Sequence, residues 1–374
     1  MDRLGVNALF LIPGKVGGSE TYLRETLREL LPLLPCACTV FTNRENDAAL
    51  RAALADTSAP RGLDFDCLGF AASNRHSRIV REQTQLTARV RRARCDILWS
   101  PGYTACLFAG CAQVVSILDM QYRRFPRDLT PVAWLATHIL VSLAARRCRR
   151  IVTISEFAKR EIAALTAAAP GRIDVAPLGA SGGFADAAPR GAGVPPYILS
   201  VAASYPHKNL PQLVRAFSAV AGRIPHRLLL AGGRGLGEKA LLDEIARSPA
   251  RDRIERLGWI GVEELKSLYA GASAFVLPSL YEGFGIPVVE AQRAGVPVVA
   301  TDRASIPEVG GDGYVPYDPA DDANLSRALL ETLSMDAPAR AALVARGRAN
   351  AAKFTWRRCA EATLASLMKA AEGG

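Results

Sequence analysis

Short apolar segments alternate with amphipathic ones along most of this chain, and glycine, proline or small polar residues separate them. A short continuous apolar run is typical of a strand buried on both faces of a parallel sheet. Such runs predict strands at 6–12, 38–41, 65–68, 97–100, 114–118 and 151–154, and again at 197–203, 227–231, 274–278 and 297–301. Helical periodicity between them, for example over 20–31, indicates repeated strand–helix units and therefore a mostly parallel, doubly wound α/β architecture.

The stretch 180–196 (ASGGFADAAPRGAGVPP) carries neither a helical nor a strand period and is rich in Gly, Ala and Pro, as linkers are. The 374-residue chain also exceeds the size at which single cores stop growing, about 250–300 residues. We expect two Rossmann-like domains, 1–185 and 196–355, with a cleft between them at their strand ends. A C-terminal helix at 356–374 is expected to pack back on the body.

The most informative stretch is 279–295 (SLYEGFGIPVVEAQRAG), which follows the predicted strand at 274–278. Two acids, Glu282 and Glu290, are eight residues apart with a Gly-Phe-Gly bend between them. Pro287 suits the beginning of a helix, because its φ is fixed and its missing N–H is not needed there. The pattern predicts strand, glycine loop and helix, with Glu282 in the loop and Glu290 in the first helical turn.

This arrangement suits a sugar nucleotide. Glycine allows the backbone to approach a ligand closely, and a helix N-terminus attracts the negative charge of a diphosphate. A carboxylate accepts two hydrogen bonds side by side, so Glu290 could bind a ribose diol and Glu282 the hydroxyls of a hexose. The alternative is an ordinary strand–helix turn with one solvated acid and one acid that complements the helix dipole. The spacing alone does not decide between them.

Two further loops follow predicted strands. The loop 13–20 (PGKVGGSE) has neither the G-x-G-x-x-G order of dinucleotide binders nor the G-K-[ST] ending of a P-loop. It is either a tight turn or a glycine shelf whose backbone touches a phosphate or sugar. In the loop 204–209 (SYPHKN), Asn209 can cap the following helix, whereas His207 and Lys208 could meet a diphosphate. A fixed cation there would stabilise the charge that develops on a leaving phosphate oxygen.

Together these motifs resemble the family-4 retaining glycosyltransferases of the GT-B fold. The resemblance is carried by P-S-x-x-E-G-F-G-x-P-x-x-E-A-x-x-x-G-x-P-V-V, S-Y-P-H-K-N, G-G-S-E-T-Y and T-I-S-E-F-A-K, and it extends from the first loop to F-T-W at 354–356. Within the family, P-H-K-N and the D-x-Q-x-x-x-F-P-x-x-x-T stretch at 119–130 are most similar to bacterial mannosyltransferases of O-antigen or exopolysaccharide assembly.

The resemblance implies catalytic roles for Glu282, Asp119 and Lys208, with Lys208 neutralising the leaving diphosphate and Asp119 near the sugar and acceptor. It implies that Glu290 binds the nucleotide ribose. The other residues implied around the donor are Gly17, Gly18, Ser204, His207, Trp259, Gly283, Phe284 and Gly285. No metal and no cofactor are implied; the donor substrate is a nucleotide sugar, GDP-mannose on the mannosyltransferase likeness, and the acceptor a glycan or lipid-linked saccharide.

Two positions depart from the family pattern. Leu118 stands where relatives often have a histidine, and Ala203 stands where many have an arginine, which leaves His207 as the second candidate cation. Another donor (a UDP-, TDP- or ADP-sugar carrying, for example, rhamnose or glucose) and a sugar-nucleotide epimerase of the same fold stay open. An NAD-dependent oxidoreductase fits poorly, since neither half opens with G-x-G-x-x-G and a following acid.

Charge adds an expectation about partners. Residues 1–190 contain 25 Lys and Arg against 17 Asp and Glu, whereas residues 191–374 contain 21 against 19. A basic half suggests an anionic partner, although such a bias can serve solubility alone. We expect no nucleic acid, because aromatic residues are not interleaved with the arginines.

The predicted helix 131–145 is apolar nearly all round and is flanked by Arg123, Arg124, Arg127, Arg146, Arg147, Arg149 and Arg150. A fully buried helix explains the apolar residues; a helix on an anionic membrane surface explains both features. No apolar run reaches the length of about 18 residues that a spanning helix needs. We therefore expect a cytoplasmic protein, peripheral at the inner face of the cytoplasmic membrane.

Metal and redox chemistry find little support. The eight cysteines form no C-x-x-C pair and suggest small buried residues of a reduced protein. Asp64 and Asp66 have the D-x-D spacing of metal-dependent glycosyltransferases, but strand alternation places both on one face. A solvated strand face is the simpler explanation.

Overall fold

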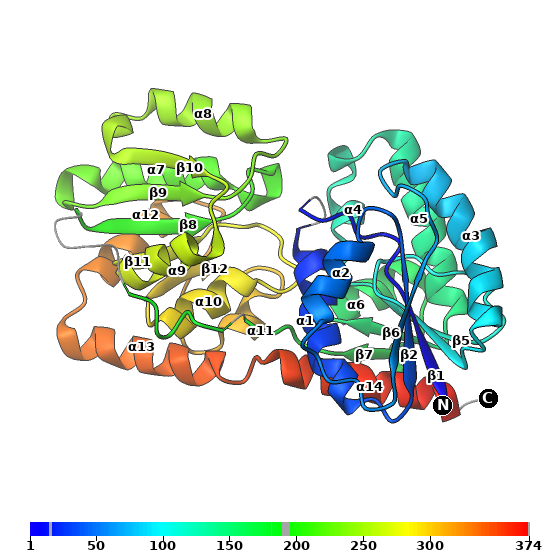
Figure 1. The fold of residues 1–374 in the computed structure, drawn as a ribbon. Helices are drawn as coiled ribbons and strands as arrows, with labels where there is room; N and C mark the ends of the chain where they lie inside the picture. The colour runs from blue at the N-terminus through cyan, green and yellow to red at the C-terminus, as the bar shows by residue number, and fades with distance from the viewer. Residues whose placement is uncertain (15–16, 181, 189–194, 373–374) are drawn as a thin grey trace. The chain divides into compact units, whose positions relative to one another are not determined.

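The computed structural model describes residues 1–14, 17–180, 182–188 and 195–372. The chain forms two compact units: Met1–Gly179 together with Thr355–Gly374, and Ala180–Phe354. Each unit has its own parallel sheet with helices packed on it (Figure 1). The predicted α/β class with two Rossmann-like domains is confirmed; the cleft expected between them stays a prediction.

The first unit contains a seven-stranded sheet in the order β3-β2-β1-β4-β5-β6-β7. Its strands are β1 (Arg3–Asn7), β2 (Ala37–Thr42), β3 (Leu63–Cys67), β4 (Ile97–Ser100), β5 (Ala112–Ser116), β6 (Arg150–Thr153) and β7 (Ile173–Val175). Its helices are α1 (Gly18–Leu30), α2 (Asp47–Leu54), α3 (Arg75–Arg92), α4 (Gln121–Arg124), α5 (Pro131–Arg147), α6 (Glu156–Thr166) and α14 (Trp356–Glu372), with 3-10 turns η1 (Leu31–Leu33), η2 (Pro126–Asp128) and η3 (Pro170–Arg172). The C-terminal helix α14 packs against α1 and strands β4 to β7.

The second unit contains a six-stranded sheet in the order β10-β9-β8-β11-β12-β13. Its strands are β8 (Tyr197–Val201), β9 (Arg227–Ala231), β10 (Ile254–Gly258), β11 (Ala274–Leu277), β12 (Val298–Thr301) and β13 (Val315–Tyr317). Its helices are α7 (Leu210–Val220), α8 (Glu238–Arg247), α9 (Val262–Gly271), α10 (Ile286–Ala294), α11 (Ile306–Gly310), α12 (Asp322–Leu333) and α13 (Ala337–Ala351), with η4 (Pro206–Lys208), η5 (Ala221–Arg223) and η6 (Arg251–Arg253). Helices α7, α8 and α12 form the core on one face of the sheet, and α9 and α10 on the other (Figure 1).

In both sheets the strand order reverses beside the first strand of the unit, so that β1 neighbours β4 and β8 neighbours β11. All strand pairings are parallel, and the carboxyl ends of neighbouring strands therefore lie at one edge. Ligands of doubly wound sheets bind at this edge, at the point of reversal. The loops that follow β8 and β11 are the ones that carry the two motifs singled out in the second half.

The first predicted strand is wrong at its carboxyl end, because β1 ends at Asn7. The segment 8–12 is apolar and buried without being a strand. Its carbonyl groups accept hydrogen bonds from the side-chain amides of Asn43 and Asn46, at 2.7–3.1 Å. These two buried amides replace the ladder partners that a strand would have used, since buried carbonyls need donors.

The apolar runs did not predict three of the strands: β7, β10 and β13, each at a sheet edge. An edge strand has one neighbour and a more exposed face, so its sequence is mixed. In β10 (IERLG) only the first residue is fully buried. Pro316 in β13 is tolerated because an edge strand has no partner on its outer side.

Helix α5 is not buried on all sides, so the simpler explanation of its apolar sequence is wrong for the first half of the helix. Its buried residues are confined to Val141, Ala144 and Ala145. Val132, Leu135 and Ile139 are 72%, 53% and 48% exposed. Within the described residues, no helix is both long and apolar enough to cross a bilayer.

Candidate active site

The loops after β8 and β11 bring a cation and a carboxylate together. Lys208 ends the turn η4, and Glu282 lies in the loop between β11 and α10. The Lys208 Nζ lies 2.8 Å from both carboxylate oxygens of Glu282, and their side chains are only 18% and 12% exposed. The two loops are also joined through the main chain, because Leu280 N donates to the His207 carbonyl at 2.8 Å. The ion pair and the main-chain hydrogen bond together connect the two loops at this edge of the sheet.

Asn209 lies between η4 and α7 with φ 53°, a left-handed conformation that asparagine tolerates better than most residues. It occupies the N-cap position, yet its side chain makes no capping bond to a backbone N–H. Its amide donates instead to the Gln212 side chain at 2.6 Å. Asn209 therefore allows the chain to turn sharply after Lys208 by its left-handed conformation. The predicted side-chain cap is wrong.

The glycine bend is built on a positive φ. Gly285 is the N-cap residue of α10 and has φ 104°, and a Cβ there would approach the Ile306 Cδ1 to 2.7 Å. The Ser305 hydroxyl donates toward the carbonyls of Glu282 and Phe284, at 2.9 and 2.8 Å. Ser305 was not singled out in the sequence, since its partners are main-chain atoms. Ser305 lies in the loop after the neighbouring strand β12, and its hydrogen bonds stabilise the bend.

The residues between the two acids contribute backbone to this bend. Phe284 is 3% exposed, and its ring meets that of Phe354 edge-on at 5.4 Å between centroids. Gly283 and Gly285 are buried. The Phe284 side chain belongs to the core, so a role of this residue in donor binding would fall to its main chain.

Glu290 lies in the second turn of α10, so its placement in the first turn is wrong. The helix begins at Ile286, and Glu290 is its fifth residue. Burial raises the pKa of Glu290 to about 7, although the hydroxyl of Tyr269 donates to its Oε2 at 3.1 Å and opposes that rise. Tyr269 comes from α9 and is fully buried; no motif had marked it.

Ser204 and His207 both turn their side chains inward, at 2% and 1% exposure. The Ser204 hydroxyl donates to Glu238 and accepts from the Gly235 N–H, and the His207 ring stacks on Tyr205 at 5.8 Å. Burial tends to raise the pKa of Glu238, but hydrogen bonds from Ser204 and Arg256 outweigh it and hold the pKa below its usual value. Donor contacts by Ser204 and His207 stay predictions.

Exposed apolar side chains follow four neighbouring strands at the same edge of the second sheet. They are Tyr205 after β8, Leu236 after β9, Trp259 after β10 and Leu280 after β11, 39%, 64%, 81% and 41% exposed. Large apolar groups left in water at one edge indicate a binding surface. Only Trp259 was expected there. Tyr205 and Leu280 lie in the two motif loops but were not themselves marked as binding residues, and Leu236 lies in a loop that no motif covers.

In the first unit, Gly17 and Gly18 stand at the beginning of α1. Gly17 has φ 56°, and among the described residues, the chain neighbours aside, no atom lies within 4 Å of a Cβ built at either glycine. Lys15, which the loop motif also contained, lies outside the described residues.

Asp119 follows β5, and its Oδ1 accepts a hydrogen bond from the Gln121 N–H at 3.0 Å. It is partly exposed, whereas its neighbour Leu118 is buried. This hydrogen bond within the turn orients the Asp119 carboxylate. Its role near sugar and acceptor stays a prediction.

The aspartates of the D-x-D pattern lie on the edge strand β3, and each has a basic partner on another element. Asp64 pairs with Arg3 at 2.6 Å, and Asp66 with Arg89 at 2.8 Å. In the described part of the chain, no group of three or more His, Cys, Asp or Glu residues is arranged to hold a metal ion. Metal independence itself stays a prediction.

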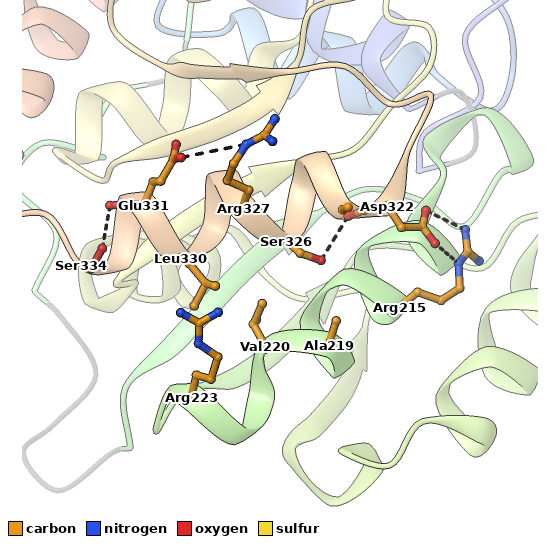
Figure 2. Close-up of a pocket in the computed structure, with 11 residues that line it drawn as sticks. Arg215, Ala219, Val220, Arg223, Asp322, Ser326, Arg327, Leu330, Glu331 and Ser334 are labelled. Carbon is orange, nitrogen blue, oxygen red and sulfur yellow. Dashed lines mark hydrogen bonds and ion pairs between the residues drawn. The ribbon is translucent and has the colours of Figure 1, made fainter.

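A cavity of about 760 Å³ lies elsewhere in the second unit, between α7 and α12 (Figure 2). Four of its five charged side chains, all but Arg223, pair with each other: Arg215 contacts both oxygens of Asp322, and Arg327 approaches Glu331 at 4.0 Å. It is lined by helix side chains and by no strand-end loop. We therefore do not assign the chemistry to it.

Two protein-family models match the chain. The model described as Glycosyltransferase Family 4 matches residues 16–181, and that described as Glycosyl transferases group 1 matches residues 187–350. Among curated proteins, the O-antigen chain mannosyltransferase B of Escherichia coli is 34% identical over 170 residues, 45% of this chain and 44% of the relative. The O-antigen chain mannosyltransferase RfbU of Salmonella typhimurium is 26% identical over 180 residues, 48% of this chain and 49% of the relative. The chain matches about half the length of these relatives.

Among solved structures, sucrose-phosphate synthase from Thermosynechococcus elongatus aligns with a TM-score of 0.77 at 16% identity, over 100% of both chains. HepE from Anabaena, solved with UDP, aligns with a TM-score of 0.74 at 18% identity, over 99% of this chain and 100% of that one. Such likeness shows the fold. The two family models cover separate halves of the chain and together span nearly all of it, so both halves match glycosyltransferase domains, on the two-domain GT-B fold that the solved structures share.

Proposed function

We propose that this protein is a retaining glycosyltransferase that moves mannose from GDP-mannose to a lipid-linked or saccharide acceptor in cell-surface polysaccharide synthesis. The observation that carries the proposal is the Lys208–Glu282 pair at the carboxyl ends of β8 and β11, beside the Gly285 bend. The names of the relatives, O-antigen chain mannosyltransferases, support the sugar and the polymer.

Donor binding is proposed to replace the contacts of the ion pair. Hexose hydroxyls donate to the Glu282 carboxylate, and Lys208 turns its ammonium toward the diphosphate. Both partners are mostly shielded from water, so each interaction is stronger than it would be on the surface. Gly17 and Gly18, at the N-terminus of α1, are proposed as a second position for phosphate oxygens, because a helix N-terminus attracts negative charge.

Transfer then needs one bond to break and one to form on the same face of the sugar. The bond between the anomeric carbon and the diphosphate oxygen breaks, and Lys208 stabilises the charge on the departing oxygen. The acceptor hydroxyl attacks from the same side, and its proton passes to the leaving phosphate. Asp119 is proposed to position the acceptor, Glu290 to bind the ribose, and Trp259 to cover the base.

The exposed face of α5 supports membrane association at an anionic surface. Val132, Leu135 and Ile139 recur at intervals of three and four residues and so share one face of the helix. Arg127 precedes this helix, and basic residues in its last turn are also exposed. Apolar residues beside arginines match the acyl and headgroup layers of a bilayer that contains anionic lipid. Such a location would bring the enzyme to a lipid-linked acceptor.

The nucleotide base decides between the proposed donor and its competitors. A thermal-shift screen against GDP, UDP, TDP and ADP is expected to show the largest rise in melting temperature with GDP. Product analysis with GDP-mannose and an isolated lipid-linked saccharide should then show a new mannoside and free GDP. Stabilisation by UDP, TDP or ADP alone would replace the proposed donor, and isomerisation of the sugar nucleotide without any acceptor would identify an epimerase.

A further inference from the structure

Tyr269 lies behind the acid that is proposed to bind the ribose. Its ring is fully buried in the core that includes α9 and α10. The ring centroid lies 5.4 Å from the ring centroid of Phe184 and 5.4 Å from that of Phe275. Its hydroxyl has two acceptors within hydrogen-bond distance, and the nearer is the Glu290 Oε2 at 3.1 Å. The Pro287 carbonyl, at 3.5 Å, is its other neighbour.

We propose that Tyr269 is a positioning residue for the donor site: its hydroxyl holds the Oε2 of Glu290, so that the Oε1 and the remaining lone pairs are presented to the ribose diol. This inference rests on the proposed function, since it needs Glu290 to bind ribose. Tyr269 itself does not touch the donor.

The geometry suits that task. A glutamate side chain has three rotatable bonds, and a carboxylate that is free to rotate loses conformational entropy when it binds a diol. The Tyr269 ring is fixed by its two aromatic neighbours, so the hydroxyl supplies a stationary anchor. An anchor of this kind lowers the cost of binding without making any contact with the ligand.

The hydroxyl also favours the ionised form of Glu290. Burial and the nearby carboxylate raise the pKa of Tyr269 far above its ordinary value, so it stays a donor at neutral pH. Burial raises the pKa of Glu290 to about 7, and the bond from Tyr269 is the interaction that opposes this rise. Tyr269, from α9, is the titratable partner that contacts this carboxylate, and no charged side chain contributes to its shift. The ionised acid accepts hydrogen bonds from both diol hydroxyls, whereas the neutral acid is a poorer acceptor.

A conservative substitution tests the inference. Tyr269→Phe keeps the ring contacts and removes the hydroxyl. Tyr197→Phe is the matched control, because Tyr197 is buried in the same core and its hydroxyl donates at 2.8 Å to the main-chain carbonyl of Leu268. Affinities for GDP and for 2′,3′-dideoxy-GDP would be measured by titration calorimetry for the wild type, both variants, Glu290→Gln and the double variant Tyr269→Phe/Glu290→Gln.

We expect Tyr269→Phe to weaken GDP binding about tenfold, the effect of one lost hydrogen bond to a charged group, and to leave dideoxy-GDP binding unchanged. Tyr197→Phe should not alter the ratio of the two affinities. The double variant should bind GDP no more weakly than Glu290→Gln alone. As the pH is lowered, Glu290 becomes protonated and GDP binding weakens. Without the Tyr269 hydroxyl the pKa of Glu290 is higher, so Tyr269→Phe should lose affinity for GDP at a higher pH than the wild type does.

If Tyr269→Phe lowers the affinities for GDP and dideoxy-GDP equally, Tyr269 has a structural role and the inference is overturned. The same holds if its loss of GDP affinity adds to that of Glu290→Gln in the double variant. The ratio of two affinities within one variant is independent of its folded fraction, so a less stable variant still gives an answer. Should Glu290→Gln weaken binding of GDP and of dideoxy-GDP equally, the ribose contact of the proposed function is wrong, and the inference falls with it.

Discussion

The Lys208 Nζ is equidistant, at 2.8 Å, from the two carboxylate oxygens of Glu282, which lies 74 positions further along the chain. The residues that the family resemblance assigns to the phosphate and to the sugar are thus partners of one another. Their ion pair joins the two strands at which the sheet order reverses. It satisfies two charges that are mostly withdrawn from water.

Lys208→Met is expected to reduce turnover by roughly 10²-fold or more, since a fixed charge near the leaving group is lost. It should also destabilise the fold by about 1–3 kcal/mol, because Glu282 keeps its charge without its partner. The double variant Lys208→Met/Glu282→Gln should recover stability and stay inactive. Urea unfolding and mannose transfer from GDP-mannose measure the two effects.

The matched control for that pair is Lys239, whose partner Asp243 lies at 2.6 Å on the exposed face of α8. Lys239→Met should alter neither stability nor turnover, because exposed pairs contribute little. A double variant of the site that is no more stable than Lys208→Met would contradict the assigned coupling.

The two acids of the bend should differ in kinetics. Glu290→Ala is expected to weaken nucleotide binding, whereas Glu282→Ala should lower turnover more than binding, because it contacts the sugar that reacts. Steady-state kinetics together with GDP affinities separate these effects. Small and equal effects from both substitutions would remove the basis of the site.

Glu290→Gln should stabilise the fold at alkaline pH while weakening the donor site. In the unfolded chain this acid loses its proton near pH 4.5, whereas in the fold its pKa is about 7. Between these values the folded state binds more protons, so stability falls as pH rises, by at most ~3 kcal/mol once pH exceeds 7. Melting temperatures should favour Glu290→Gln at pH 8 and should differ least at pH 4.5. A constant difference between wild type and variant across this range would show that Glu290 does not titrate as described.

The exposed face of α5 should be required for binding to anionic vesicles. We expect the wild type to co-sediment with phosphatidylglycerol-containing liposomes and to be released by salt, because each basic residue near such a surface contributes about 1 kcal/mol. Leu135→Ser/Ile139→Ser should reduce the bound fraction. Leu242→Ser, at a 46% exposed position in α8, serves as the control and should have no effect. Equal binding to neutral and anionic vesicles would rule out the proposed surface.

Transfer is expected to continue in EDTA, since the proposed mechanism stabilises the leaving diphosphate with Lys208 and helix N-termini. Turnover measured before and after chelation, with added Mg²⁺ as the reference, tests this directly. Complete loss in EDTA with recovery in Mg²⁺ would require a metal ligand set that the proposal does not contain.

The sequence by itself determined the interior strands, the glycine bend and the position of an acid and a cation in loops that follow strands. These features are local: a continuous apolar run specifies a strand with neighbours on both sides, and a Gly-Phe-Gly bend before Pro287 specifies how the chain leaves it. Parallel topology then places strand ends together without any further information. This is why Lys208 and Glu282 could be expected at one site before their contact was seen.

The tertiary structure alone decided which apolar segments are strands and which side of α5 meets water. The run at 8–12 became a buried loop because Asn43 and Asn46, distant in sequence, supply its donors. Tyr269 acquired its position behind Glu290 because α9 packs against α10. Contacts of this kind depend on which elements become neighbours, and composition or periodicity within one segment carries no record of its neighbours.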